Sequence, residues 1–129
     1  MKPKIGILYS TVDGQTLKIC NLIQEVLEEK GNAVEIFSIE DFKGNVTDFD
    51  KFIIGASIRY GKHSPKIIEF INQNKAALDS IENAFFSVNL VARKPEKASP
   101  ETNPYYIKFL QTIHWIPKTS AVFAGKLDY

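Results

Sequence analysis

A chain of 129 residues that is 44% apolar and 24% charged is long enough for one domain with a packed core, and this composition is that of a soluble globular protein. Its 16 basic and 15 acidic residues give a net charge of +1, which excludes a global attraction to nucleic acid. The one cysteine, Cys20, excludes an intramolecular disulfide and a cysteine cluster for zinc or iron–sulfur. Because no apolar run is long enough for a signal peptide or a membrane span, we expect a cytoplasmic location.

Three short apolar runs in the first half of the chain predict strands. They cover residues 4–9 and 51–58, which show little polarity, as expected of strands covered on both faces, and residues 33–39, in which apolar and polar residues alternate. Residues 40–50 are polar and rich in turn-forming side chains, so we expect a loop or a short helix there.

The first helix is predicted over residues 15–30, where apolar side chains recur at three- and four-residue spacing. Gly31 stands where a helix commonly ends. The apolar stripe consists of Ile19, Cys20, Leu22, Ile23, Val26 and Leu27. Since Cys20 lies on this stripe, we expect it to pack in the core rather than to act as a reactive thiol.

The segment that joins the first strand to this helix, residues 10–16, carries the features of a phosphate-binding loop. Free backbone N–H groups and the positive end of a helix dipole meet at such a turn, and both favour an anion. Gly14 allows a close approach of the backbone, while Ser10, Thr11 and Thr16 offer hydroxyl donors. The segment has neither the lysine of a nucleoside-triphosphate loop nor a Gly-x-Gly-x-x-Gly fingerprint. An ordinary strand-to-helix turn with a hydroxyl N-cap is the alternative.

The second half of the chain predicts two more helices and two more strands. Ser64-Pro65 and Asn103-Pro104 are each typical of a helix start, and apolar residues at helical spacing follow both. The first of these apolar stripes runs over residues 67–78. We expect strands over residues 83–91 and 119–127.

Strands that alternate with helices at this spacing predict an α/β fold with a doubly wound parallel sheet and right-handed crossovers. In such sheets ligands bind at the carboxyl ends of the strands, near the switch in strand order. Three predicted loops lie at that edge, namely residues 10–16, 57–63 and 87–97.

Three segments carry a resemblance that is more specific than the fold class. They are residues 9–16 (YSTVDGQT), 54–61 (IGASIRYG) and 86–97 (FSVNLVARKPEK). They resemble the flavodoxin-like family, and within it the menaquinone-dependent protoporphyrinogen IX dehydrogenases of bacterial haem synthesis. The resemblance spans essentially the whole chain. It implies a single flavodoxin-like domain over residues 1–129, a five-stranded parallel sheet in the order 2-1-3-4-5, and FMN as the cofactor.

The resemblance also implies which residues hold FMN. The phosphate would lie among Ser10, Thr11, Asp13, Gly14, Gln15 and Thr16. The flavin ring would border Ser57, Ile58, Arg59, Tyr60, Gly61, Ser87, Asn89 and Leu90. Electron-carrying flavodoxins usually have threonine at the position of Asp13, so we expect this carboxylate to cap backbone N–H groups or to face solvent. No spacing of His, Asp and Glu suggests a metal site.

The family continues past the fifth strand into a further loop and a final helix, which this sequence lacks. The resemblance therefore implies a C-terminally truncated domain. The final helix covers the same sheet face as the first helix, and its absence would leave roughly 400 Å² of apolar sheet uncovered, on the order of 10 kcal/mol at ~25 cal/mol per Å². We expect a truncated form, or a homo-oligomer that buries this face.

The implied reaction is the oxidation of protoporphyrinogen IX to protoporphyrin IX, with electrons passed through FMN to menaquinone or another quinone at the periphery of the inner membrane. Such a substrate carries two propionates, and the loops at the sheet edge supply cations that suit an anionic substrate or membrane surface. The cations of this rim are Lys62, Arg93, Lys94 and Lys97. Arg59, on the flavin loop, and His63, whose imidazole could accept a proton near pH 7, are the candidate catalytic residues; a histidine just before a Ser-Pro helix start is more often a plain surface residue, which is the alternative for His63.

Two other classes of function fit less well. A flavodoxin-type electron carrier would bind FMN in the same way and dock protein partners, but such carriers are typically strongly acidic, whereas this chain is near neutral. A phosphoacceptor signalling domain of similar topology needs an acidic pair after the first strand and an aspartate after the third. Ser10-Thr11 and Ser57-Ile58 occupy those places.

Overall fold

A computed structural model of the chain describes residues 3–10, 15–59, 62–63, 65–88, 115 and 117–123. At residues 15, 57–59, 62–63 and 121–123 it describes the backbone alone.

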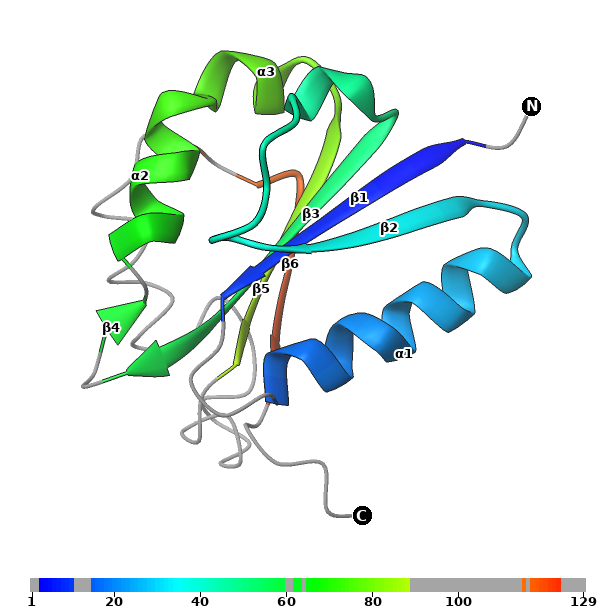
Figure 1. The fold of residues 1–129 in the computed structure, drawn as a ribbon, viewed down its shortest axis with the longest axis horizontal. Coiled ribbons are helices and arrows are strands. Elements are labelled where there is room, and N and C mark those ends of the chain that lie inside the picture. The colour runs from blue at the N-terminus through cyan, green and yellow to red at the C-terminus, as the bar shows by residue number, and fades with distance from the viewer. Residues whose placement is uncertain are drawn as a thin grey trace.

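Five parallel strands form the central sheet in the order β2-β1-β3-β5-β6 (Figure 1). Their bounds are Lys4–Ser10 (β1), Ala33–Ser38 (β2), Lys51–Arg59 (β3), Glu82–Val88 (β5) and Thr119–Phe123 (β6). Taken in chain order, these strands have the predicted order 2-1-3-4-5, so the predicted doubly wound sheet is confirmed. The short strand β4 (Lys62–His63) pairs antiparallel with the end of β3 and was not predicted, because two residues are too few to show a period.

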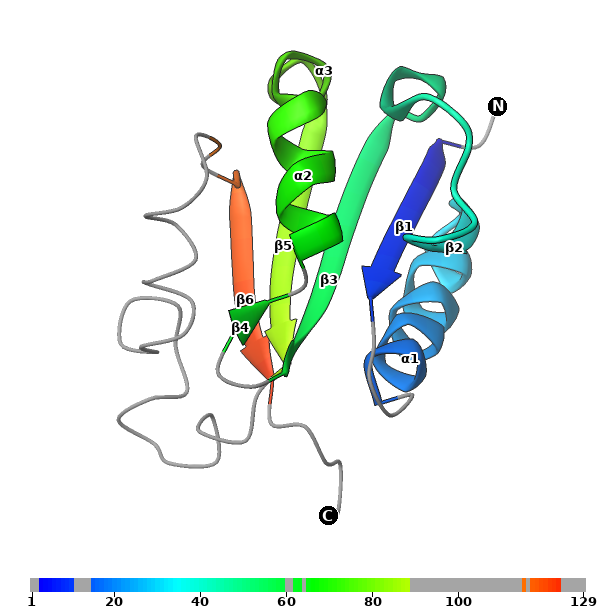
Figure 2. The same ribbon diagram turned by 60° about the vertical axis from the view of Figure 1, so that its left-hand side comes forward.

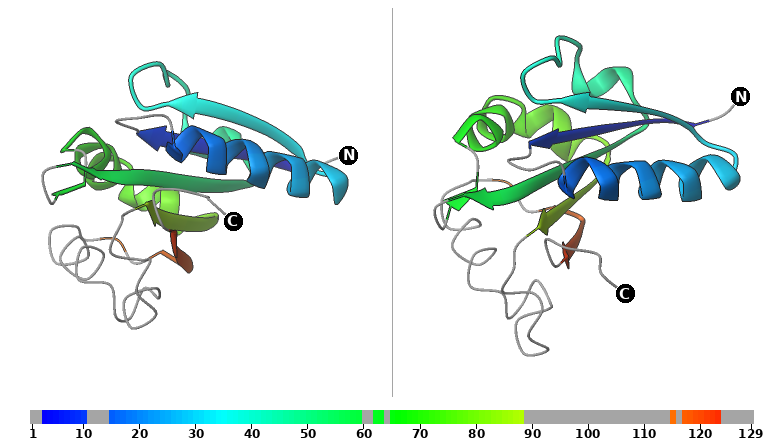
Figure 3. Two further views of the ribbon diagram at one scale, coloured as in Figure 1. Left: turned by 90° about the horizontal axis from the view of Figure 1, so that it is seen from below. Right: turned by 60° about the horizontal axis from the view of Figure 1, so that its bottom comes forward.

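Helices cover both faces of the sheet (Figures 2 and 3). The helix α1 (Gln15–Glu29) lies on one face, and α2 (Pro65–Gln73) and α3 (Lys75–Asp79) lie on the other. A 3-10 helix, η1 (Val46–Asp48), occupies the segment predicted as a loop or short helix.

The structure divides the single helix predicted after Pro65 into α2 and α3 at Asn74. The backbone N–H and the side-chain amide of Asn74 both donate to the carbonyl of Phe70, at 3.0 and 2.9 Å. The backbone bond is the ordinary helical one, and the side-chain amide adds a second donor to the same carbonyl, a local bond of the kind that favours asparagine at helix ends. The helix predicted after Asn103-Pro104 lies outside the described residues, apart from Trp115.

Two apolar layers fill the space between sheet and helices. The layer on the α2 side contains Leu8, Phe52, Ile54, Ala56, Phe85, Ile67, Ile71, Leu78, Val46, Phe49 and Trp115. The layer on the α1 side contains Ile5, Ile7, Val34, Phe86, Val88, Ile19 and Cys20. Successive residues of β1 alternate between the two layers, as the pleat of a strand requires. The α2-side layer is rich in aromatic rings, and Trp115 meets Phe85 edge to face at a centroid distance of 6.5 Å.

The predicted stripe of α1 is confirmed for Ile19 and Cys20 but wrong for Leu22 and Val26, which are 52% and 51% exposed. At 100° per residue, these two side chains lie on the flank of the helix rather than on the side that faces the sheet. The opposite flank carries Gln24, whose amide donates to the carbonyl of Val34 on β2 at 3.2 Å. Leu22 and Val26 therefore lie on the flank that faces away from β2.

Part of the sheet face that was expected to be uncovered is buried. Phe86 and Val88 of β5, on the α1 side, are each only 3% exposed. The ring of Phe86 lies directly over Gly55 of β3, where a Cβ atom would collide with it. This close packing reduces the apolar area that the sheet leaves open. A homo-oligomer formed through this face stays a prediction.

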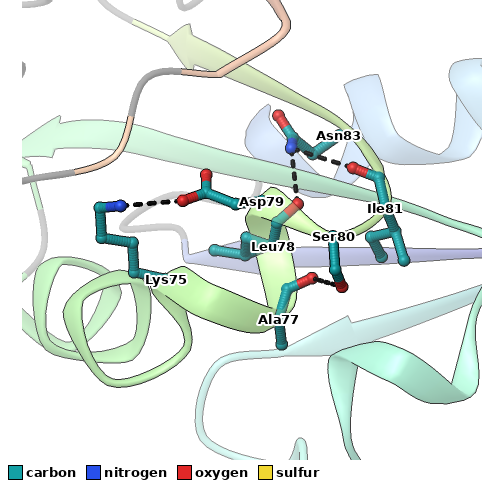
Figure 4. Close-up of polar contacts among 7 residues, drawn as sticks. All are labelled: Lys75, Ala77, Leu78, Asp79, Ser80, Ile81 and Asn83. Atoms are coloured by element: carbon teal, nitrogen blue, oxygen red, sulfur yellow. Dashed lines mark hydrogen bonds and ion pairs between the residues drawn. The ribbon is translucent and has the colours of Figure 1, made fainter.

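Asn83 fastens the amino ends of β5 and β6 together. Its side-chain amide donates to the carbonyls of Leu78 and Ile81 at 2.8 and 3.2 Å (Figure 4). Its side-chain oxygen accepts from the backbone N–H of Lys118 at 2.8 Å. These bonds satisfy the amide of a residue that is only 6% exposed. They fix the register of β5 and β6 at one end of the sheet, which aligns both strands at the other end.

Candidate functional site

The carboxyl ends of β1, β3 and β5 bring three small residues into one row. In the strand register Ser10 lies opposite Ala56, and Ala56 lies opposite Ser87. All three are buried, with exposed fractions of 9%, 0% and 0%. The segments come from distant parts of the chain, and the arrowheads of β1, β5 and β6 point to the same edge (Figure 2). The predicted meeting of Ser10 and Ser87 at this edge is confirmed, whereas Ala56 between them had not been singled out.

Two buried hydroxyls at this edge have no hydrogen-bond partner among the described residues. They are Oγ of Ser10, at the end of β1, and Oγ1 of Thr16, in the first turn of α1. Thr16 is completely buried. A buried hydroxyl without a partner costs about 1–3 kcal/mol, and native structures retain few of them without a functional reason. Both residues flank residues 11–14 in the chain, the segment predicted to bind a phosphate.

The amino end of α1 adds an electrostatic reason for an anion here. This helix has 15 residues, and its first turn carries no acidic side chain that would neutralise the positive end of the dipole. Backbone N–H groups of the first turn lack partners within a helix. Uncharged hydroxyls together with a helix amino end form the kind of site that binds a phosphate without a lysine.

A short two-stranded ribbon extends the same edge of the sheet. The backbone pairing of β3 with β4 places Ile58 opposite His63 and Arg59 opposite Lys62. The structure thus brings together three predicted site residues, Arg59, Lys62 and His63. Their common position at the carboxyl end of β3 was expected, but their pairing across a ribbon had no signal in the sequence.

The remaining predicted site residues are Ser57 and a group that lies outside the described part of the chain. Ser57 belongs to β3 and pairs with Val88 of β5. The residues that lie outside the described part of the chain are Thr11, Asp13, Gly14, Tyr60, Gly61, Asn89, Leu90, Arg93, Lys94 and Lys97. Their roles stay predictions, as does that of the Gln15 side chain.

The described residues contain no group of three or more His, Cys, Asp or Glu side chains that could hold a metal ion. Among the described helices, none has the length and apolar character needed to cross a bilayer.

Comparison with known proteins identifies the family. A family model described as a flavodoxin domain matches residues 6–129, and the chain therefore belongs to the flavodoxin-domain family. Among curated proteins, the chain is similar to the protoporphyrinogen IX dehydrogenase (quinone) of Escherichia coli strain K12. The two are 43% identical over 127 residues, which are 98% of this chain and 70% of the relative.

Solved structures show the same fold at much lower sequence identity. A flavodoxin from the domain Archaea superposes with a TM-score of 0.64 at 17% identity, covering 94% of this chain and 84% of that one. A mutant flavodoxin of Fusobacterium nucleatum, solved with flavin mononucleotide bound, superposes with a TM-score of 0.52 at 17% identity, covering 95% and 68%.

Cys20 is the described group whose pKa is most strongly shifted. It is fully buried, and desolvation raises the pKa of its thiol from 9.0 to about 12. Desolvation penalises the charged thiolate, so the predicted role in core packing rather than in thiol chemistry is confirmed.

We predict that Cys20 resists alkylation by iodoacetamide in the native protein throughout pH 7–9. With the pKa at about 12, the thiolate fraction at pH 8 is about 10⁻⁴, and access to the thiol is blocked as well. The same protein in guanidinium chloride should react fully, as followed by mass spectrometry. Alkylation of the native protein as fast as that of the unfolded chain would contradict the burial of this thiol.

Proposed function

We propose that the chain binds FMN at the carboxyl edge of its sheet and uses it to oxidise protoporphyrinogen IX, with a quinone as electron acceptor. The observation that carries the proposal is the 43% identity, over 98% of the chain, to an enzyme named protoporphyrinogen IX dehydrogenase (quinone). The flavodoxin-domain match and the structural likeness to a flavodoxin solved with flavin mononucleotide support the cofactor.

The described residues fit the phosphate of this cofactor. Ser10 and Thr16 each have a buried hydroxyl without a partner among the described residues; Thr16 lies in the first turn of α1, and Ser10 is the last residue of β1. Thr11, Asp13, Gly14 and Gln15 would complete the loop around the phosphate. Hydroxyl and backbone N–H donors hold an anionic group without introducing a counter-charge, and the helix dipole favours its negative charge.

The other two loops would hold the flavin ring and the substrate. Residues 57–61 with Ser87, Asn89 and Leu90 would border the ring at the sheet edge where Ala56 and Ser87 lie side by side. Bound FMN would supply the redox chemistry, accepting two electrons at a time from the porphyrinogen and giving them to the quinone. The residues of the chain orient the substrate and exclude water, and His63 is the candidate acceptor for a released proton.

We also propose that menaquinone and the inner membrane meet the protein at this edge, and the basic rim supports this part of the proposal. Lys62, Arg93, Lys94 and Lys97 would attract the propionates of the substrate or the anionic surface of the membrane. Peripheral attachment would let a quinone reach the exposed edge of the flavin from the bilayer.

We predict that Thr16→Val separates cofactor binding from stability. Valine has the shape of threonine without its unpartnered hydroxyl, so the apoprotein should be as stable as the wild type or more so, by up to about 1 kcal/mol. The affinity for FMN should fall about tenfold or more, because a hydrogen bond to a charged phosphate is lost. Fluorescence titration of the apoprotein with FMN and urea unfolding measure the two effects.

Thr47→Val is the matched control, since Thr47 is exposed in η1 and far along the chain from the loop. It should leave the FMN affinity unchanged. An unchanged FMN affinity in Thr16→Val would remove Thr16 from the phosphate site.

We predict that the FMN-loaded protein raises porphyrin fluorescence when it is given protoporphyrinogen IX and a menaquinone analogue under anaerobic conditions. The rise should depend on both the quinone and FMN. A protein that binds FMN but shows no quinone-dependent rise would contradict the dehydrogenase and favour the flavodoxin-type electron carrier. The near-neutral net charge of +1 argues against a carrier of the strongly acidic kind.

A further inference from the structure

The backbone register of the β3–β4 ribbon pairs two basic residues. Arg59 lies directly opposite Lys62, and the neighbouring pair is Ile58 with His63. Residues that are directly opposite in an antiparallel pair stand on the same face of the ribbon. Arg59 and Lys62 therefore share one face, and Ile58 and His63 share the other.

This pairing is unfavourable for the ribbon taken by itself. Like charges directly opposite each other destabilise an antiparallel pair. The ribbon consists of only two residue pairs, and short isolated hairpins are marginal in water. An anion bound between the two cations would replace the repulsion by two charge-assisted interactions. The register thus favours an anionic ligand at this point of the fold.

The cation pair lies beyond the row of small residues that ends the sheet. Arg59 follows Ala56 by three residues on β3, which is about 10 Å at the rise of a parallel strand. Ala56 lies opposite Ser10, whose unpartnered hydroxyl belongs to the candidate phosphate site. The backbone of the ribbon thus lies beyond the candidate phosphate site along the sheet edge, which favours a separate anion subsite there.

We propose that Arg59 and Lys62 form a cross-strand clamp for a carboxylate of the tetrapyrrole substrate. This inference rests on the proposed function, because it assigns the ribbon to the substrate of that same site. A guanidinium binds a carboxylate through two parallel hydrogen bonds, and an ammonium adds a point charge from the opposite strand. The clamp orients the substrate by its propionate and leaves the tetrapyrrole ring facing the sheet edge.

The test compares an acid with its ester on the FMN-loaded protein. Protoporphyrin IX keeps both propionates and is stable, whereas its dimethyl ester has the same ring without the charges. Binding of each, followed by fluorescence quenching, does not require turnover. The wild type should bind the acid about tenfold or more tightly than the ester, the ratio expected for a carboxylate held by charge-assisted hydrogen bonds.

Three variants isolate the clamp. Arg59→Gln and Lys62→Gln should each weaken binding of the acid about tenfold while changing binding of the ester less than about twofold. Lys51→Gln is the matched control, because Lys51 is an exposed lysine at the opposite end of the same strand. It should bind both ligands as the wild type does. FMN affinity should be the same in Lys62→Gln and Lys51→Gln, which also shows that these two are folded, and far-UV circular dichroism shows whether Arg59→Gln is folded.

Several results would overturn the clamp. Equal binding of acid and ester by the wild type would exclude recognition of a carboxylate. Equal weakening of acid and ester in Arg59→Gln and Lys62→Gln would give these residues a structural role instead. Loss of binding to phosphatidylserine vesicles, with the preference for the acid intact, would assign the pair to the membrane. A wild type that fails to bind FMN would refute the proposed function itself, whereas the other outcomes leave that function standing.

Discussion

The parallel pairing of β3 with both of its neighbours is the constraint on which the site depends. One register aligns Ser10 with Ala56, and another aligns Ala56 with Ser87, so three segments that are far apart in the chain end at one edge. The strands β1, β3 and β5 have buried residues on both faces, and a slip of one residue would exchange their two apolar layers. Asn83 fixes the register at the amino end of β5 and β6 through bonds to Leu78, Ile81 and Lys118. The core therefore sets the position of the loops.

Large buried side chains and candidate site residues occupy different parts of the sheet. In β3, Phe52 and Ile54 fill the α2-side layer, and the small residues Gly55 and Ala56 follow them along the strand. Among the described residues, the buried side-chain atoms without a hydrogen-bond partner are Ser10 Oγ, Thr16 Oγ1 and Trp115 Nε1, and the two hydroxyls flank residues 11–14 in the chain. A phosphate bound at residues 11–14, as proposed, would interact favourably with the dipole of α1 and could accept a hydrogen bond from such a hydroxyl.

The sequence was sufficient for the architecture because the strands are short apolar runs and because Ser64-Pro65 marks a helix start. It was less informative where a single residue interrupts a helix, and where exposure depends on how much of a helix surface the sheet covers. Asn74 divides α2 from α3 by bonding back to Phe70, and spacing alone could not reveal this. Leu22 and Val26 fit the periodicity of α1 yet are exposed, since periodicity does not show how wide the covered stripe is. The pairing of Arg59 with Lys62 required the register of β4, whose two residues carry no pattern.

The central claim is that the edge formed by β1, β3 and β5 holds FMN, and the visible absorption spectrum of the purified protein tests it most directly. The account predicts a yellow protein with the two flavin bands, and denaturation should release FMN in about a one-to-one ratio to the chain. If the protein is purified colourless, added FMN should restore the spectrum. A colourless protein whose spectrum and fluorescence show no binding of added FMN would contradict the account.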